Sequence, residues 1–130
     1  MAKSFATLGE LEIQVLRLVW QHQPCTERQI SDLVQQDRPV ARTTVLKTLQ
    51  RLEAKGILAR VPGQSPIRFR ATLDEEHVLP VLTRRFVERV LGGSPGPLLA
   101  YFSDSGRLSD KDVKALRAIA RKIAQPPQQK

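Results

Sequence analysis

The sequence contains a single cysteine, Cys25, among its 130 residues. One thiol cannot form a disulfide within the chain, and one cysteine cannot build a cysteine-based metal cluster. The two histidines, His22 and His77, are far apart in the sequence, which favours helix capping or solvent exposure over a metal site. We therefore expect no metal and no cofactor, and we expect Cys25 to be a small buried residue.

Long apolar runs are missing as well. No stretch approaches the roughly 20 apolar residues that cross a bilayer. The first seven residues, Met-Ala-Lys-Ser-Phe-Ala-Thr, lack the apolar core of a signal peptide. We expect a soluble, cytoplasmic protein that does not insert into a membrane.

Negative charge is scarce relative to positive charge. The chain has 13 Asp and Glu against 21 Lys and Arg, which gives a formal net charge of +8. Such a balance favours a polyanionic partner, either nucleic acid or an anionic membrane surface. The membrane alternative has less support, because no helix combines a Lys-rich face with Trp and Phe on the other face.

Motifs of the common enzyme classes are absent. The sequence has no Gly-rich phosphate loop, no His-x-x-x-His pair, no serine nucleophile elbow and no pair of carboxylates in an apolar setting. Glu75 and Glu76 suit the positive start of a helix instead. We therefore expect the protein not to be an enzyme.

Residues 42–56 show the spacing of a helix with two different faces. Val45, Leu49 and Leu52 recur at intervals of four and three, which places them on one side of a helix. The other side carries hydroxyl groups and positive charge, at Thr43, Thr44, Lys47, Thr48 and Arg51. Such a face suits insertion into the DNA major groove, although an ordinary surface helix has the same spacing.

Two helices are predicted before this one, and the second of them is short. Thr7 and Glu10 have the spacing of a capping box, and an apolar stripe over residues 8–20 follows them. Thr26 and Gln29 repeat that spacing and predict a second helix, which Pro39 ends. A short helix, a tight turn and a helix with a polar face together predict a helix-turn-helix.

Residues 57–61 and 67–71 predict a hairpin, because apolar and basic residues alternate in the second segment. We expect Leu58, Ile67 and Phe69 to pack on the helices. Three arginines would lie on the other side or along the edge, namely Arg60, Arg68 and Arg70. Three helices followed by a basic hairpin predict a winged helix-turn-helix, mainly α with a small β-hairpin wing, as a DNA-binding domain over residues 1–72.

Residues 73–124 return to helical spacing. Pro80 either starts the first helix or bends it, residues 97–102 predict a short buried helix, and Ser109 with Asp112 predicts the cap of a last helix. The apolar faces of these few helices are too small to form a stable hydrophobic core by themselves. We therefore expect a helical dimerisation domain over residues 73–124, a homodimer, and a flexible tail over residues 125–130. The expected dimer contacts are Leu79, Leu82, Phe86, Val90, Leu116, Ile119 and Ile123.

Two runs carry a resemblance to a known family. They are Leu-Gly-Glu-Leu-Glu-Ile at residues 8–13 and Thr-Thr-Val-Leu-Lys-Thr-Leu-Gln-Arg-Leu at residues 43–52. They resemble the penicillinase-repressor (BlaI/MecI) family, and similar segments occur at residues 92–95 and 108–110. The resemblance covers residues 7–124. It implies a dimeric winged-helix transcriptional repressor with an N-terminal DNA-binding domain and a C-terminal helical dimerisation domain.

The resemblance also implies roles for individual residues. The recognition-helix positions that face bases and phosphates correspond to Thr43, Thr44, Lys47 and Thr48. Arg51 and Arg68 correspond to positions of contact with the DNA backbone, with Arg68 on the wing. Arg42 stands where the family often has an aromatic residue, and it adds a cation at the groove edge.

The family resemblance implies a further partner, a membrane sensor protease whose activation leads to cleavage of the repressor. The bond cleaved in that family joins Asn to Phe and aligns with Tyr101 and Phe102, which makes these two residues the candidate proteolytic site. The Asn is replaced here, which departs from the family pattern. Copper-responsive relatives carry paired cysteines near the C-terminus, and none is present in this sequence, so we predict no copper sensor.

The working hypothesis is a homodimeric repressor that binds an inverted-repeat operator in double-stranded DNA. One alternative is a winged-helix module that mediates protein–protein contact, because a fold does not determine a function. Another alternative is a non-specific nucleic-acid binder. The basic, hydroxyl-rich face of residues 42–56 favours DNA over a protein partner.

Overall fold

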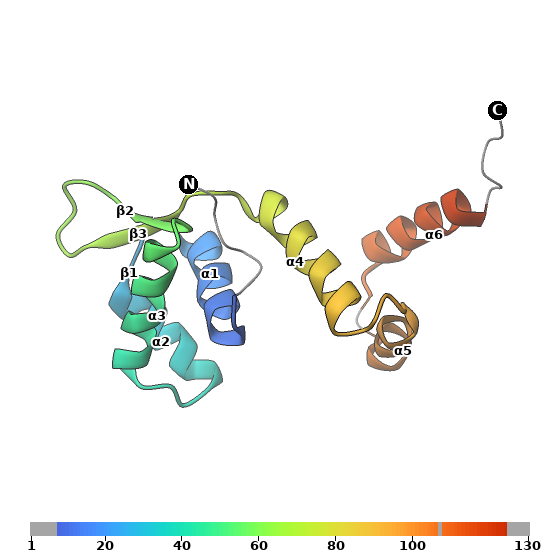
Figure 1. The fold of residues 1–130 in the computed structure, drawn as a ribbon, viewed down its shortest axis with the longest axis horizontal. Coiled ribbons are helices and arrows are strands. Elements are labelled where there is room, and N and C mark those ends of the chain that lie inside the picture. The colour runs from blue at the N-terminus through green and yellow to red at the C-terminus, as the bar shows by residue number, and fades with distance from the viewer. Residues whose placement is uncertain (1–7, 107, 125–130) are drawn as a thin grey trace. The chain divides into compact units, whose positions relative to one another are not determined.

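The computed structural model describes residues 8–106 and 108–124. The chain divides into two compact units, residues 1–86 and 87–130. The helices are α1 (Glu10–His22), α2 (Glu27–Asp37), α3 (Arg42–Ala54), α4 (Glu75–Arg89), α5 (Gly96–Ser105) and α6 (Asp110–Ala124) (Figure 1). The strands are β1 (Cys25–Thr26), β2 (Leu58–Arg60) and β3 (Arg68–Ala71). None of the helices within the described ranges is long and apolar enough to cross a membrane.

Helix α1 begins at Glu10, and the Glu12 carboxylate closes its first turn. Glu12 Oε1 accepts a hydrogen bond from the Gly9 N–H at 2.8 Å, which satisfies one of the backbone donors near the start of the helix. The predicted capping residue Thr7 lies outside the described residues. The apolar face of α1 is buried as predicted, at Val15, Leu16 and Val19.

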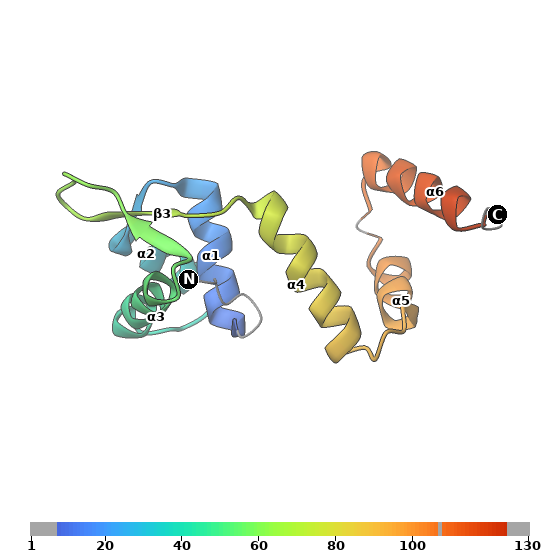
Figure 2. The same ribbon diagram turned by 45° about the horizontal axis from the view of Figure 1, so that its top comes forward.

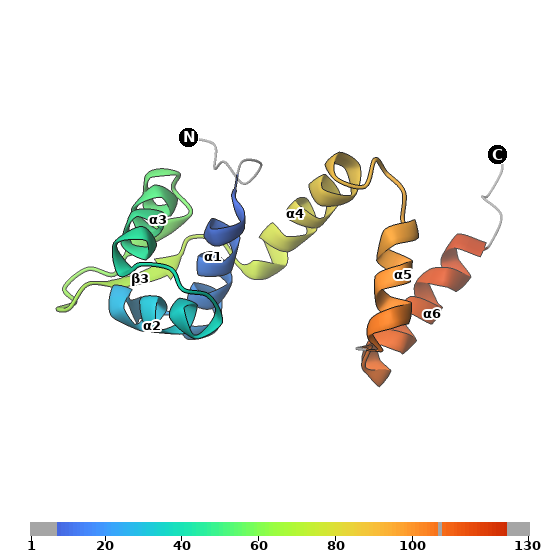
Figure 3. The ribbon, with the colours of Figure 1, turned by 90° about the horizontal axis from the view of Figure 1, so that it is seen from below.

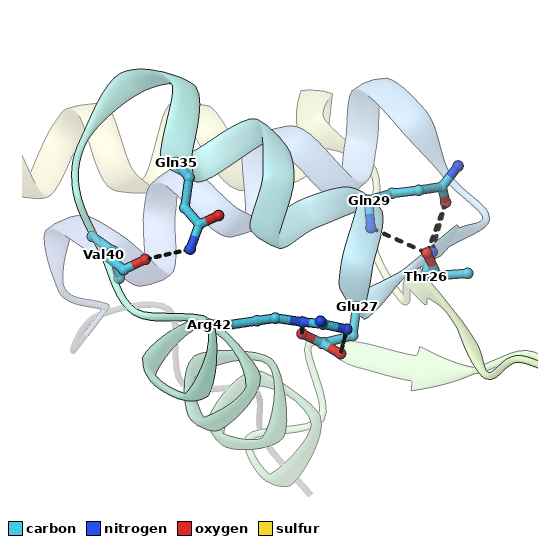
Figure 4. Close-up of polar contacts among 6 residues, drawn as sticks. All are labelled: Thr26, Glu27, Gln29, Gln35, Val40 and Arg42. Carbon is cyan, nitrogen blue, oxygen red and sulfur yellow. Dashed lines mark hydrogen bonds and ion pairs between the residues drawn. The ribbon is translucent and has the colours of Figure 1, made fainter.

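Helices α2 and α3 form the predicted helix-turn-helix. Thr26 Oγ1 accepts a hydrogen bond from the Gln29 N–H at 3.1 Å, and Gln29 Oε1 accepts one from the Thr26 N–H at 2.8 Å. The predicted capping box is therefore confirmed. In the turn between the helices, Gln35 Nε2 donates to the Val40 carbonyl at 3.0 Å (Figure 4). Helix α3 buries the predicted apolar face, at Val45, Leu49 and Leu52.

A three-stranded antiparallel sheet in the order β1–β3–β2 completes the first unit. Strands β2 and β3 form the predicted hairpin, with Leu58 opposite Ala71 and Arg60 opposite Phe69. The loop between them extends away from the three helices (Figure 2). Strand β1 was not predicted, and it pairs Cys25 with Phe69. Cys25 is fully buried, as expected.

The expected packing of the hairpin is confirmed for two of its three apolar residues. Leu58 and Phe69 are buried, whereas Ile67 is 46% exposed. The prediction for Ile67 is wrong because β3 begins only at Arg68. The alternation of buried and exposed side chains holds within a strand and does not extend into the loop before it.

The core of the first unit is completed by the start of α4. Val78 is fully buried, and Leu82 packs against the core from the same helix. Trp20 Nε1 donates to the Leu73 carbonyl at 2.9 Å, which ties α1 to the segment before α4. The sequence left open whether the helix starts at Pro80 or bends there. Pro80 lies inside α4, so the helix does not start at this residue.

The second unit contains α5 and α6 (Figure 3), and a groove of about 330 Å³ is lined by Phe102 of α5 and by Leu116 and Ile119 of α6. The predicted cap of α6 is confirmed, because the Asp112 N–H donates to Ser109 Oγ at 3.1 Å. Helix α5 is longer than the predicted residues 97–102. The prediction that this helix is buried is wrong, since Leu99 and Tyr101 are more than half exposed. Two short helices offer too little surface to cover both sides of α5.

The predicted domains describe assembly, whereas these two units describe compactness within the single chain. Compactness places the first part of α4 with the winged helix and divides the chain after Phe86, whereas the sequence-based division after residue 72 assigns all of α4 to dimerisation. The predicted dimerisation domain, residues 73–124, therefore stays a prediction about assembly. The predicted tail, residues 125–130, lies outside the described residues.

Candidate nucleic-acid interface

The solvent-facing side of α3 carries a row of polar side chains. Thr43, Lys47 and Gln50 are exposed and recur at intervals of four and three, so they lie on one side of the helix. Lysine suits the acceptors of guanine, glutamine suits the paired groups of adenine, and threonine suits several base edges. Gln50 was not predicted, because the sequence argument searched for charge and hydroxyl groups. Its spacing from Lys47 was the signal that could have revealed it.

The prediction that Thr48 contacts DNA is wrong. The Thr48 side chain is 1% exposed, and its hydroxyl donates to the Thr44 carbonyl at 2.8 Å. Thr48 lies three residues after Val45 and four before Leu52, which places it on the buried side of α3. The Thr44 side chain is exposed and stays a predicted contact.

Arg42, the first residue of α3, forms an ion pair with Glu27, the first residue of α2 (Figure 4). Arg42 Nε lies 3.0 Å from Glu27 Oε2, and Arg42 Nη2 lies 3.3 Å from Glu27 Oε1. The hydrogen bonds and the charge of Glu27 raise the pKa of Arg42. The Arg42 side chain is still 52% exposed, so it is accessible at the edge of α3 while it is paired.

A second ion pair joins the end of α3 to the start of α1. Lys55 Nζ lies 2.8 Å from Glu12 Oε2. Burial alone would raise the pKa of Glu12, but the Gly9 N–H and the Lys55 ammonium outweigh burial, so the pKa is lowered. The charge of Arg51 acts in the same direction, and the Arg51 side chain is exposed. Its contact with the DNA backbone stays a prediction.

The arginines of the wing have different surroundings. Arg60 Nε lies 2.8 Å from Glu53 Oε2, and the guanidinium lies 5.7 Å from the centre of the Phe69 ring, within the range of a cation–π contact. Arg68 is half-buried. Burial raises the pKa of Cys25 to about 11, and the Arg68 charge opposes this shift. The predicted contact of Arg68 with DNA remains untested.

An open hollow of about 470 Å³ lies between the starts of α2 and α3 and the wing. Its lining combines apolar side chains with cations and includes Arg28, Arg42, Leu46, Arg60, Ile67 and Phe69. The hollow explains why Leu46 and Ile67 have exposed side chains. Helix α3 and the wing are therefore two separate surfaces that border one positively charged recess.

The described residues offer no metal site of the usual kind. Among residues 8–106 and 108–124, no group of three or more His, Cys, Asp or Glu is placed to hold a metal ion. His22 and His77 are both exposed. The expectation of no cofactor stays a prediction.

The predicted dimer contacts fall into two groups. Leu79 and Leu82 are partly buried within their own chain. Four others expose apolar surface, namely Phe86, Val90, Leu116 and Ile119. The side chain of Ile123 lies outside the described residues. Contact with a second copy of the chain stays a prediction for all of them.

The profile of the family described as "Penicillinase repressor" matches residues 8–122. The chain belongs to the penicillinase-repressor family. The family predicted from the residue 8–13 and 43–52 runs is thereby confirmed, and the match includes the exposed row on α3.

Two proteins that are similar to the chain are distant from it in sequence. The chain is 27% identical to an uncharacterized 16.5 kDa protein of Latilactobacillus sakei, covering 92% of this chain and 82% of that protein. It is 21% identical to the methicillin resistance regulatory protein MecI of Mammaliicoccus sciuri, covering 88% and 94%.

Two solved structures share the fold. MarR has a TM-score of 0.54 at 19% identity, covering 92% of this chain and 78% of MarR. A MarR family protein from Bacillus stearothermophilus has a TM-score of 0.53 at 19% identity, covering 90% and 73%. These neighbours confirm the predicted winged-helix fold. The fold and the penicillinase-repressor family together support a DNA-binding transcriptional regulator, and a repressor family suggests a regulator that is not an enzyme.

Proposed function

We propose that this member of the penicillinase-repressor family is a sequence-specific repressor that binds an inverted-repeat operator as a homodimer. The observation that carries the proposal is the exposed row of Thr43, Lys47 and Gln50 on α3. These side chains supply hydrogen-bond donors and one positive charge on a helix, which fits the major groove. The wing then lies along the flanking DNA backbone.

Lys47 is the cation of the exposed row on α3, and we expect it to contribute to phosphate binding. Arg42 and Arg60 each form an ion pair with a carboxylate, whereas no ion pair involves Lys47 within the part of the chain that the structure describes. Binding of a phosphate by Lys47 therefore does not require an existing pair to break. Each phosphate neutralised adds about 0.9 to the slope of log affinity against log salt concentration.

Homodimerisation is supported by the apolar surface of the C-terminal part of the chain. Val90, Leu99 and Ile119 are each more than half exposed in the single chain, and large exposed apolar side chains favour contact with another surface. A two-fold dimer presents two copies of α3 to two half-sites. Their centres would lie roughly 34 Å apart, or a multiple of that distance.

Proteolytic derepression has weaker support and stays outside the proposal. Tyr101 and Phe102 lie within α5, and their rings pack edge to face with centroids 5.5 Å apart. A protease that binds extended peptides would first have to unwind this helix. The family's Asn is also replaced by Tyr101. A cytoplasmic location follows from the proposed DNA partner.

The proposed function is tested by selecting DNA from a pool of random duplexes with the purified full-length protein at near-physiological salt. Recovery of a palindromic motif with fixed half-site spacing would support a dimeric, sequence-specific repressor. Binding without a motif, lost as salt rises, would support the non-specific alternative. An absence of DNA binding would favour a module for protein–protein contact.

A further inference from the structure

The pair of Glu27 and Arg42 leaves part of the Arg42 guanidinium available. Glu27 occupies the side of the guanidinium that carries Nε and Nη2. An arginine side chain has five N–H donors, and this pair uses two of them. The Nη1 donors and one Nη2 donor remain at the end of the side chain. This free end matches the spacing of two acceptors, such as guanine O6 and N7.

The surroundings of Glu27 fix the position of its carboxylate. Glu27 is the first residue of α2, where the positive end of the helix favours a negative charge. The preceding residue, Thr26, is held by its reciprocal hydrogen bonds with Gln29. The Glu27 side chain is 24% exposed, so water competes for it only in part. A two-point contact with such a carboxylate restricts both the direction and the rotation of the Arg42 guanidinium.

We propose that Glu27 is a specificity-determining residue that positions Arg42 for base contact and weakens the attraction of Arg42 for phosphate. This inference rests on the proposed function, because it concerns the choice between operator and other DNA. Non-operator DNA is bound chiefly through its phosphates, and the Glu27 carboxylate cancels much of the positive charge that Arg42 offers there. A base pair that fits the free end of Arg42 gains two hydrogen bonds without breaking the ion pair.

The location of the pair supports this role. Glu27 and Arg42 both line the hollow between α2, α3 and the wing, and both belong to the helix-turn-helix. Arg42 is at the start of α3, the end that usually enters the groove first. A carboxylate at this point acts on the DNA that α3 approaches, whereas Glu10, which pairs with Arg38 at 3.5 Å, is on α1.

The test compares Glu27→Gln with the wild type, using the selected operator and an unrelated duplex at 50 and 200 mM salt. The variant keeps the size of the side chain and removes its charge. We expect it to bind the unrelated duplex more tightly. If Arg42 of each subunit in the proposed homodimer gains one phosphate contact, that affinity should fall about 12-fold more than the wild-type affinity over the fourfold rise in salt. The ratio of operator to non-operator affinity should decrease.

Two further variants separate charge from positioning. Glu27→Asp keeps the charge on a shorter side chain, so we expect a salt slope near that of the wild type and weaker operator binding. In the double variant Glu27→Gln with Arg42→Ala, the affinity ratio should equal that of Arg42→Ala alone. Glu10→Gln is the matched control, because it removes one carboxylate from another Arg–Glu pair, and it should leave the ratio unchanged.

The outcomes distinguish this inference from the proposed function. If the wild type prefers no sequence, the proposed function fails and this inference fails with it. If the wild type prefers its operator but Glu27→Gln has an unchanged ratio, only the role of Glu27 is refuted. The role of Glu27 is also refuted if its substitution has the same effect in the Arg42→Ala background. Circular dichroism shows whether each variant is folded, and Glu27→Asp tests positioning if Glu27→Gln does not fold.

Discussion

Replacing Lys47 with alanine should weaken DNA binding and reduce its dependence on salt. Lys47 is exposed on α3 between Thr43 and Gln50, and its side chain is not part of the core, so the fold should be unaffected. In the proposed homodimer the substitution removes two phosphate contacts, one from each subunit. At about 0.9 per phosphate, the slope of log affinity against log salt concentration should decrease by about 1.8.

The size of this effect is large enough for a direct assay. Over a fourfold rise in salt, from 50 to 200 mM, a difference of about 1.8 in slope corresponds to about a 12-fold difference in affinity loss. Fluorescence anisotropy with a labelled operator duplex measures both affinities. The wild type should lose about 12-fold more affinity than Lys47→Ala over this range.

Lys111→Ala provides the matched control, because it removes an equal charge from an exposed position on α6. It should leave the salt slope close to that of the wild type. Equal slopes for the wild type and Lys47→Ala, with unchanged circular dichroism, would refute the phosphate contact proposed for Lys47. An equal decrease of the salt slope in Lys47→Ala and Lys111→Ala would show that DNA binding depends only on the total charge of the protein.

Three further predictions concern stability and assembly. The pKa of Glu12 is lowered from its ordinary 4.5, so the ionised carboxylate stabilises the fold above that pH, and this stabilisation is lost as pH falls through the folded-state pKa. Lys55→Met should lower the free energy of unfolding by about 2 kcal/mol at neutral pH. In denaturant titrations across pH 3–7, the free energy of unfolding of this variant should depend less on pH than that of the wild type. Cys25 is fully buried with a pKa of about 11, so a thiol reagent at pH 8 should react with it only after denaturation, and fast reaction in the native state would contradict its burial. Ile119→Glu places a charge on exposed apolar surface of α6, so sedimentation should show a folded monomer in place of the proposed dimer; an unchanged dimer would exclude Ile119 from the interface.

Much of the winged helix could be predicted from sequence because its signals are local. The reciprocal spacing of Thr26 and Gln29 identifies the start of α2, and the interval between apolar residues identifies the buried side of α3. Strand β1 could not be found in this way, because two residues are too few to show an alternating pattern. Strand β1 forms because Cys25 pairs with Phe69 of β3, a residue 44 positions later in the chain.

Two features of the candidate site differ from what the sequence led us to expect, and each has a physical reason. Thr48 was chosen for its hydroxyl, although its spacing from Val45 and Leu52 places it on the buried side of α3. The partner of Arg42 could not be predicted, because the contact with Glu27 depends on how α2 and α3 pack. The packing of α5 and α6 could not be predicted either, since Leu99, Leu116 and Ile119 are not covered within the single chain.

Methylation interference on the selected operator tests the central claim most directly, because methylation of guanine N7 blocks the major groove where α3 is proposed to bind. The account predicts two symmetric clusters of interfering guanines, separated by about one helical turn of 10 to 10.5 base pairs or a multiple of it. Tight, sequence-selective binding that tolerates methylation at every guanine N7, while the operator contains guanine in both half-sites, would contradict major-groove recognition by α3.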